Sequence, residues 1–139
     1  MSFSTLSDLN WIAVLVATII YFAIGGFWYS NAGFGKVWIR ASGNTPPEGA
    51  PGAKYMIGPL VTSLIASIAT AMLALATGSS TLGHGIVLGL VVAIGYAGTL
   101  SALGALFDAK PEPRTWFVIN FGYHLVSLVV VGILVSVWD

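Results

Sequence analysis

The sequence predicts an all-α membrane protein with four transmembrane helices in an antiparallel bundle and a short interfacial helix after the first. Of its 139 residues, 57% are hydrophobic and 7% are charged, whereas about a quarter of the residues in a soluble domain carry a charge. Three charge-free stretches cover residues 9–35, 55–107 and 115–138. Because a helix needs about 20 residues to cross the hydrocarbon layer, the middle stretch is long enough for two crossings. We therefore expect one transmembrane domain over residues 1–139.

The first span is expected over residues 9–30, with Ser7 or Asp8 as its N-cap. An amphipathic helix over residues 33–42 should follow it in the headgroup layer, because apolar and basic residues occupy opposite sides at helical spacing. Aromatic and basic side chains settle at membrane–water interfaces. The residues expected to anchor this region at the membrane surface are Trp28, Tyr29, Lys36, Trp38 and Arg40.

The remaining spans are separated by polar, turn-forming segments. Residues 42–53 are rich in Pro, Gly and small polar residues and should form an exposed linker. The second span is expected over 54–77, where Pro59 either starts the regular helix or kinks its first turn. The third is expected over 82–107 and the fourth over 115–138. A tight turn between the second and third spans makes them antiparallel neighbours.

The basic residues predict the orientation. The first and third loops hold all five of them, and none lies at a terminus or in the second loop: Lys36, Arg40, Lys54, Lys110 and Arg114. The positive-inside rule places those loops in the cytoplasm and both termini outside it. In the third loop, Asp108 is placed to meet Lys36 or Arg40, although a solvated loop is the simpler interpretation.

Small residues recur every four positions along the third span. Such faces let helices approach closely in lipid, where no hydrophobic drive acts between helices. The span should therefore be the central helix or the most closely approached one, within one chain or between chains. Its predicted packing face is Gly85, Gly89, Ala93, Ala97, Ser101 and Ala105. Ser63, Ser67 and Ala71 form a matching row in the second span. We expect the hydroxyl groups of this region to bond to carbonyls of their own helix; the alternative is that they line a polar path.

The fourth span carries polar residues in its middle, in the segment NFGYHL. At helical spacing, Asn120, Tyr123, His124 and Ser127 share one side, and His124 lies about 15 Å deep, near the bilayer midplane. An unpartnered polar group in hydrocarbon costs several kcal/mol, so this face must point into the bundle, a cavity or another subunit. His124 is the strongest candidate for function, as a proton acceptor or ligand contact. The competing interpretation is a neutral imidazole bonded to Tyr21, Tyr96, Asn120 or a carbonyl.

The sequence predicts no enzyme, catalytic group, metal or cofactor. His84 lies about 15 Å in depth from His124, no carboxylate occupies a span interior, and no second titratable group lies within reach of His124. Cysteine is absent, which excludes thiol chemistry. A haem held by His124 of two subunits is disfavoured. Zero net charge and the lack of a basic patch exclude nucleic acid as a partner.

Two segments carry a resemblance to a known family. The first is Trp28-Tyr29-Ser30, followed by Phe34-Gly35-Lys36 with Trp38, and the second is Gly122-Tyr123-His124. They resemble a widespread family of small bacterial membrane proteins with four predicted spans, catalogued only as a domain of unknown function. The resemblance covers essentially the whole chain, implies the four-span architecture and the bacterial inner membrane, and implies no activity. Asn31 departs from the family pattern, which has Pro after W-Y-S, so the break after the first span should be softer.

Two functions remain open at this point. The first is a non-enzymatic accessory or structural subunit, embedded in the lipid bilayer, that forms a homo-oligomer or joins a larger membrane complex. The alternative is a small oligomeric transporter or channel that uses the polar face around His124. The first predicts that a span contacts another chain, and the second predicts a hydrated cavity that reaches His124.

Overall fold

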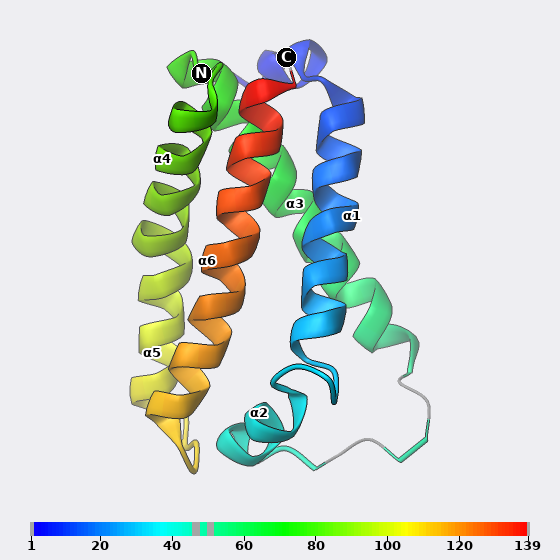
Figure 1. Ribbon diagram of the computed structural model, residues 1–139, viewed down its shortest axis with the longest axis vertical. Coiled ribbons are helices and arrows are strands. Elements are labelled where there is room, and N and C mark those ends of the chain that lie inside the picture. Colours follow the sequence, from blue (N-terminus) through cyan, green and yellow to red (C-terminus); the bar gives the residue numbers. More distant parts are fainter. Residues whose placement is uncertain (1, 46–47, 50–51, 139) are drawn as a thin grey trace.

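Four long helices form an antiparallel bundle in the computed structural model, which describes residues 2–45, 48–49 and 52–138 (Figure 1). They are α1 (Trp11–Trp28), α3 (Ala53–Thr77), the continuous helix Leu82–Phe107, and α6 (Pro113–Val137). The helix Leu82–Phe107 comprises α4 (Leu82–Val92), a π-helical turn η2 (Ala93–Gly98) and α5 (Thr99–Phe107). Each is long and apolar enough to cross a membrane. The predicted fold class is confirmed.

A short helix, α2 (Gly35–Ser42), follows the first span as predicted. It lies at the end of the bundle opposite the termini (Figure 1). Gly35 and Ala41 are buried while Lys36 and Arg40 are exposed, so the amphipathic pattern matches its packing. Gly43 ends α2 with a φ of +74°, a conformation that glycine adopts without strain. Residues 46–47 and 50–51 of the predicted linker 42–53, and residues 1 and 139 of the predicted domain, lie outside the described residues.

The N-terminal cap differs from the prediction. Residues Phe3–Asp8 form a 3-10 helix, η1, so the cap of α1 is Asn10 rather than Ser7 or Asp8. The Asn10 side chain accepts hydrogen bonds from the amides of Ile12 and Ala13, both at 3.1 Å. Its Nδ2 donates to the carbonyl oxygen of Trp138 at 2.8 Å. One side chain therefore caps α1 and ties it to the end of α6.

The position of Pro59 excludes one of its two predicted roles. Helix α3 begins at Ala53, so Pro59 lies inside it rather than at its start. Every described residue from 52 to 62 is exposed. Figure 1 shows this first part of α3 leaning away from the bundle, and its later turns bury Ser63, Ser67 and Thr70.

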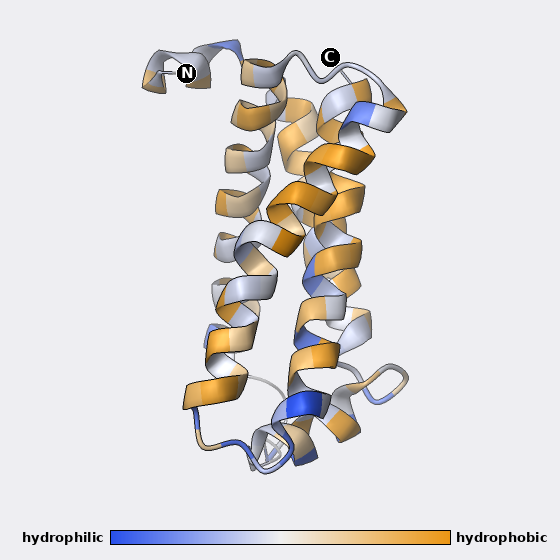
Figure 2. Ribbon diagram, turned by 90° about the vertical axis from the view of Figure 1, so that its left-hand side faces the viewer, coloured by the Kyte–Doolittle hydropathy of each residue, from blue (hydrophilic) through white to orange (hydrophobic). Residues whose placement is uncertain are grey.

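Helix α6 is the centre of the bundle, packing against α1, α2, α3 and the helix Leu82–Phe107. The third span, predicted to be the central or the most closely approached helix, is not central: it packs mainly on α6, and its α4 part also meets α3. Its approach to α6 is the most extensive between two elements, which agrees with the second half of the prediction. Hydrophobic residues predominate along the long helices, and hydrophilic residues lie at both ends of the bundle, most strongly at the end that holds α2 (Figure 2). The core therefore lies along α6, and the predicted polar face belongs to this central helix.

Candidate functional site

The polar face of α6 is divided between two sets of partners. His124 Nδ1 and the Tyr21 hydroxyl of α1 share a hydrogen bond of 2.7 Å, whose donor depends on the imidazole tautomer. Tyr21 is buried and His124 is half-buried. Of the partners expected for His124, Tyr21 is the one that forms this hydrogen bond. Tyr96 is 66% exposed on the outer surface and cannot take that role.

Asn120 joins three spans. Its Oδ1 accepts a hydrogen bond from the Tyr29 hydroxyl at 3.0 Å, at the end of α1. Its Nδ2 donates to Ser101 Oγ of α5 at 2.9 Å. One residue earlier, the carbonyl of Ile119 accepts a 3.0 Å bond from Trp28 Nε1. Two residues predicted as surface anchors therefore bond to α6, and a predicted packing residue, Ser101, is a hydrogen-bond acceptor.

Tyr123 lies at the centre of an aromatic cluster. Its ring centroid is 5.5 Å from that of Tyr21, 5.3 Å from Tyr29 and 4.7 Å from His124. Trp38 of α2 extends the cluster, with its centroid 5.3 Å from Tyr29 in an edge-to-face arrangement. Such geometry stabilises aromatic pairs by about 0.5–1.5 kcal/mol beyond area burial. The cluster connects α2, α1 and α6, so the predicted anchor Trp38 also packs inside the protein.

Other buried hydroxyl groups differ in whether they have a hydrogen-bond partner. Thr18 and Thr70 bond back to the carbonyl four residues earlier, each at 2.8 Å. Within the described part of the chain, the hydroxyls of Ser67, Ser127 and Ser136 are buried without a hydrogen-bond partner. The expectation of back-bonding in the second span therefore holds for Thr70 and fails for Ser67. Ser127 of the predicted polar face is buried and forms no hydrogen bond with a described residue.

The predicted small-residue face packs within this chain. A Cβ atom added at Gly85 would lie 2.6 Å from Ile133 Cα, and one added at Gly89 would lie 2.5 Å from Val129 Cα. Gly132 on α6 faces Gly85 in turn. Ala93 and Ser101 are buried, while Ala97 and Ala105 are half-buried. The backbones of α4 and α6 thus approach so closely that only glycine fits, as in small-residue helix pairs of membranes.

The basic end of the bundle holds two ion pairs. Arg40 Nε lies 2.7 Å from Glu112 Oε1, and Lys110 Nζ lies 3.2 Å from Asp108 Oδ2. The hydrogen bond from Arg40 lowers the pKa of the Glu112 carboxyl below its ordinary value. Asp108 therefore pairs within its own loop, and the expectation that it meets Lys36 or Arg40 is wrong. The pairing puts Glu112 against α2.

The described residues include no cluster of three His, Asp or Glu side chains that could hold a metal ion. His84 is exposed at the start of α4, where its amide donates to the capping hydroxyl of Thr81 at 3.2 Å. The termini and this turn lie at the same end of the bundle, opposite α2 (Figure 1). His84 and His124 are thus separated, as their positions in the sequence predict.

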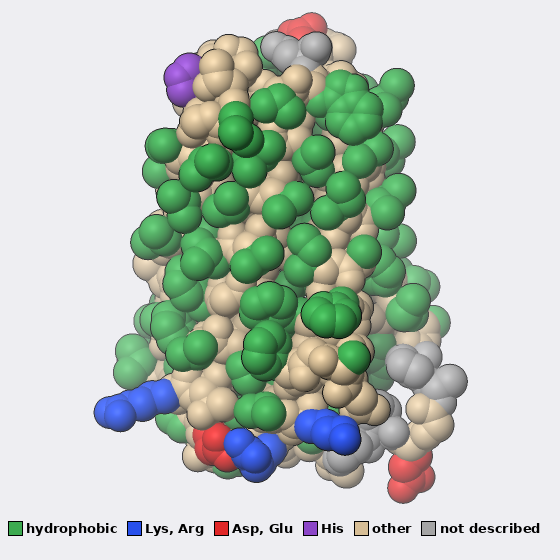
Figure 3. Space-filling view, in the orientation of Figure 1, with side chains coloured by type: hydrophobic (Ala, Val, Ile, Leu, Met, Phe, Trp, Pro, Cys, Tyr) green, Lys and Arg blue, Asp and Glu red, His purple; other side chains and the backbone are tan. Residues whose placement is uncertain are grey.

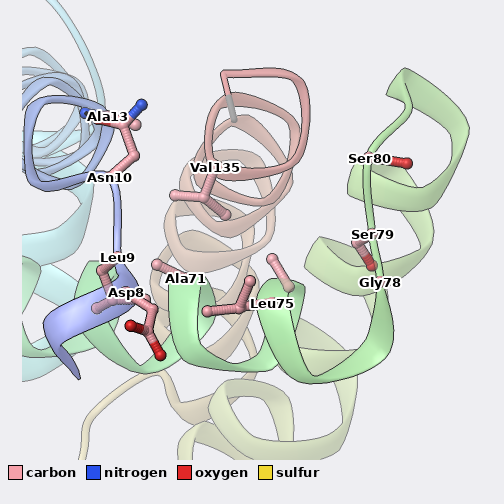
Figure 4. A pocket seen from close by; sticks show the side chains of 11 residues that line it. Asp8, Leu9, Asn10, Ala13, Ala71, Leu75, Gly78, Ser79, Ser80 and Val135 are labelled. Atoms are coloured by element: carbon pink, nitrogen blue, oxygen red, sulfur yellow. Dashed lines mark hydrogen bonds between the residues drawn. The ribbon is translucent and has the colours of Figure 1, made fainter. Parts of the chain in front are cut away.

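A small cavity of about 90 Å³ lies near the termini, between η1 and the ends of α3 and α6. Figure 4 shows Asp8 on one side and Ser80 on the other, with Ala71, Leu75 and Val135 between them. The polar atoms do not converge on one point, so the cavity lacks the oxygen cage that a metal ion requires. It is also remote from the polar face of α6.

The chain was compared with known proteins. Residues 12–136 match a family model described as "Protein of unknown function (DUF1761)". No curated protein and no solved structure matches the chain. The match extends over all four spans.

Proposed function

We propose that this chain, which belongs to the DUF1761 family of proteins of unknown function, is a non-enzymatic structural or accessory subunit of a membrane assembly. The proposal rests on the contacts within the chain. The observation that carries the proposal is that the polar side chains in the middle of α6 bond to other helices. His124 bonds to Tyr21, and Asn120 bonds to Tyr29 and Ser101. Groups used in this way fix helix register and satisfy their own polar atoms.

A second observation supports assembly with another chain. The first part of α3 is exposed on all sides, and a Cβ added at Gly58 would meet no atom within 4 Å. Ile57 beside it is 58% exposed. The exposed surface of this segment is free for a helix of another subunit, either a second copy or a larger complex.

The absence of cysteine makes the assembly directly testable, because one introduced cysteine is then unique. An Ile57→Cys variant should form disulfide-linked dimers, or cross-links to a partner, in native membranes under mild oxidation. Leu103→Cys is the matched control, because Leu103 is 51% exposed on α5, on another part of the bundle. Equal cross-linking by both variants, or none by either, would contradict assembly through α3.

The alternative is a small oligomeric transporter or channel. It is favoured by the buried hydroxyls of Ser67, Ser127 and Ser136, which bond to no described protein atom and would provide polar groups along a path. Proton flux should be compared in liposomes holding the native chain, His124→Phe or no protein. The structural proposal expects equal flux in all three. Flux that requires His124 while the assembly remains intact would overturn it in favour of transport.

We also propose that the α2 end faces the cytoplasm, that both termini lie outside it, and that the membrane is the bacterial inner membrane. The support is the gathering of basic side chains at the α2 end, as the positive-inside rule requires (Figure 3). Single cysteines at Ser4 and Lys36 should report the orientation in intact cells. A membrane-impermeant maleimide should label Ser4→Cys and spare Lys36→Cys, and the opposite pattern would refute the orientation.

A further inference from the structure

The two ends of the bundle differ in charge. The segments at the α2 end carry all five basic residues of the chain, together with the acidic residues Glu48, Asp108 and Glu112. Of the described residues at the other end, Asp8 is the charged one. Figure 3 shows the Lys and Arg side chains projecting around the lower end and absent from the visible shaft. The α2 end is therefore the electropositive end.

The basic residues at this end are not equivalent, because two are occupied by partners. Arg40 is paired with Glu112. Lys110 is paired with Asp108, its side chain is only 14% exposed, and its ammonium lies 4.2 Å from the centroid of the Trp116 ring. Both cations are paired with carboxylates of the chain and hold the 108–112 loop in place.

Lys36 and Arg114 differ from these two. Both are exposed, and neither forms an ion pair with a carboxylate among the described residues. Lys36 occupies the first turn of α2 and Arg114 the first turn of α6. Lys54, in the first turn of α3, lies with its ammonium 5.1 Å from the centroid of its neighbouring Tyr55 ring. Lys36 and Arg114 are thus the cations best placed to meet a ligand from outside.

The elements that carry these two cations are joined to each other. Besides the Arg40–Glu112 pair, the Glu112 amide donates to the carbonyl of Ala41 at 3.3 Å. The side chain of Pro111 packs beside Gly43, at the end of α2. Because α2 is fixed to the start of α6 in this way, Lys36 and Arg114 belong to two elements that are held together at the same end of the bundle.

Aromatic side chains place this surface at the level of the lipid headgroups. Phe27 near the end of α1 and Phe34 at the start of α2 are 64% and 44% exposed. Aromatic residues of this kind settle at the membrane–water boundary, where a phospholipid presents its phosphate above its acyl chains. Anionic headgroups attract basic residues at the membrane surface, with about fivefold stronger association per Lys or Arg at low ionic strength.

We infer that the α2 end binds anionic phospholipids, with Lys36 and Arg114 each contacting a headgroup phosphate and the exposed aromatic residues contacting the acyl region. This goes beyond the proposed structural role and does not depend on assembly. The bond from the Glu112 amide to Ala41 and the packing of Pro111 beside Gly43 hold α2 against α6 without the Arg40–Glu112 side-chain pair. The ligand is a lipid of the surrounding leaflet rather than a soluble phosphate, because exposed aromatic residues lie at the same end of the bundle as the two cations.

The test compares spin-labelled phosphatidylglycerol with spin-labelled phosphatidylcholine around the full chain in phosphatidylcholine bilayers. Electron paramagnetic resonance gives the fraction of each lipid immobilised on the protein, and the ratio of the two association constants is the readout. The native ratio should exceed one and fall several-fold in Lys36→Gln/Arg114→Gln. It should also fall in 1 M salt, where the screening length is about 3 Å.

The matched control is Arg40→Gln/Glu112→Gln, which also changes two residues at this end but removes a cation and an anion that neutralise each other. It should keep most of the native ratio. Lys36→Arg/Arg114→Lys changes the same two residues but keeps both charges, so it should keep the ratio. This variant distinguishes the loss of charge from misfolding. A native ratio of one, or the same loss in both glutamine double variants, would overturn the inference.

Discussion

Replacing Gly89 with alanine tests the contact between α4 and α6 most directly. The new Cβ would lie 2.5 Å from both Leu128 O and Val129 Cα, whereas optimal carbon–carbon contact lies at about 3.5–4.0 Å. These are backbone atoms of α6 and cannot rotate away, so the helices must separate by about 1 Å. Overpacking of this kind costs about 1–3 kcal/mol.

The comparison needs a control because alanine is the better helix former by about 0.8–1.0 kcal/mol. Gly83→Ala supplies it, since Gly83 lies on the same helix and a Cβ there has Thr81 Oγ1 as its nearest neighbour, 4.0 Å away. The free energy of unfolding should therefore be about 1–3 kcal/mol lower for Gly89→Ala than for Gly83→Ala.

The assay is reversible unfolding by dodecyl sulfate in mixed micelles, followed by the circular dichroism of the helices. The same titration on both variants cancels the common gain in helix propensity. Equal unfolding free energies for Gly89→Ala and Gly83→Ala would refute the argument that the backbones of α4 and α6 are in contact at Gly89.

Two further predictions concern the polar contacts. Tyr21→Phe and His124→Phe should each lower the unfolding free energy, and a double-mutant cycle should give a coupling of about 0.6–1.7 kcal/mol, the range for hydrogen bonds between membrane helices; a coupling of zero would contradict the Tyr21–His124 bond. The carboxyl of Glu112 has a lowered pKa because Arg40 bonds to it, so its stabilising contribution is complete above the pKa of an unfolded glutamate and is lost as the pH falls through the lowered value. The Glu112 amide should therefore be less protected from hydrogen exchange at acid pH than at neutral pH, and Glu112→Gln should remove that difference. Equal protection at the two pH values in the native chain would refute this prediction.

The spans were predictable because they depend on composition and length. The third was expected over 82–107 and is observed over Leu82–Phe107. The expected bounds of the others lie within two residues of the observed bounds. Charged residues or short polar turns separate these stretches, and lipid forces the enclosed backbone to be helical.

The contacts between spans were less predictable. Helical spacing placed Asn120 and His124 on one side of α6, but it gave no distance to another helix. It could not show that Asn120 would meet Tyr29 and Ser101 while His124 met Tyr21. The π-helical turn Ala93–Gly98 also left no clear mark in the sequence. Pairings of this kind depend on how helices rotate and cross, which local spacing does not determine.

Helix α6 makes two kinds of contact along its length. Whether they contribute independently to the free energy of unfolding can be tested by additivity. Toward the end that holds the termini, its backbone at Leu128 and Val129 lies against Gly89. Toward the basic end it presents the hydrogen-bonding amide of Asn120. Eight residues of helix, about 12 Å, separate Asn120 from Leu128.

Sites more than 7–10 Å apart without shared partners give unfolding energies that add within about 0.3–0.5 kcal/mol. The Gly89→Ala/Asn120→Ala double variant should therefore lose the sum of the two single losses, measured by the same dodecyl sulfate titration. Asn120→Ala with Tyr29→Phe is the contrasting pair, because those residues share a hydrogen bond and their losses should overlap. Strong coupling between Gly89 and Asn120 would mean that α6 shifts as a rigid body, so that its glycine contact and its polar contacts form one cooperative unit.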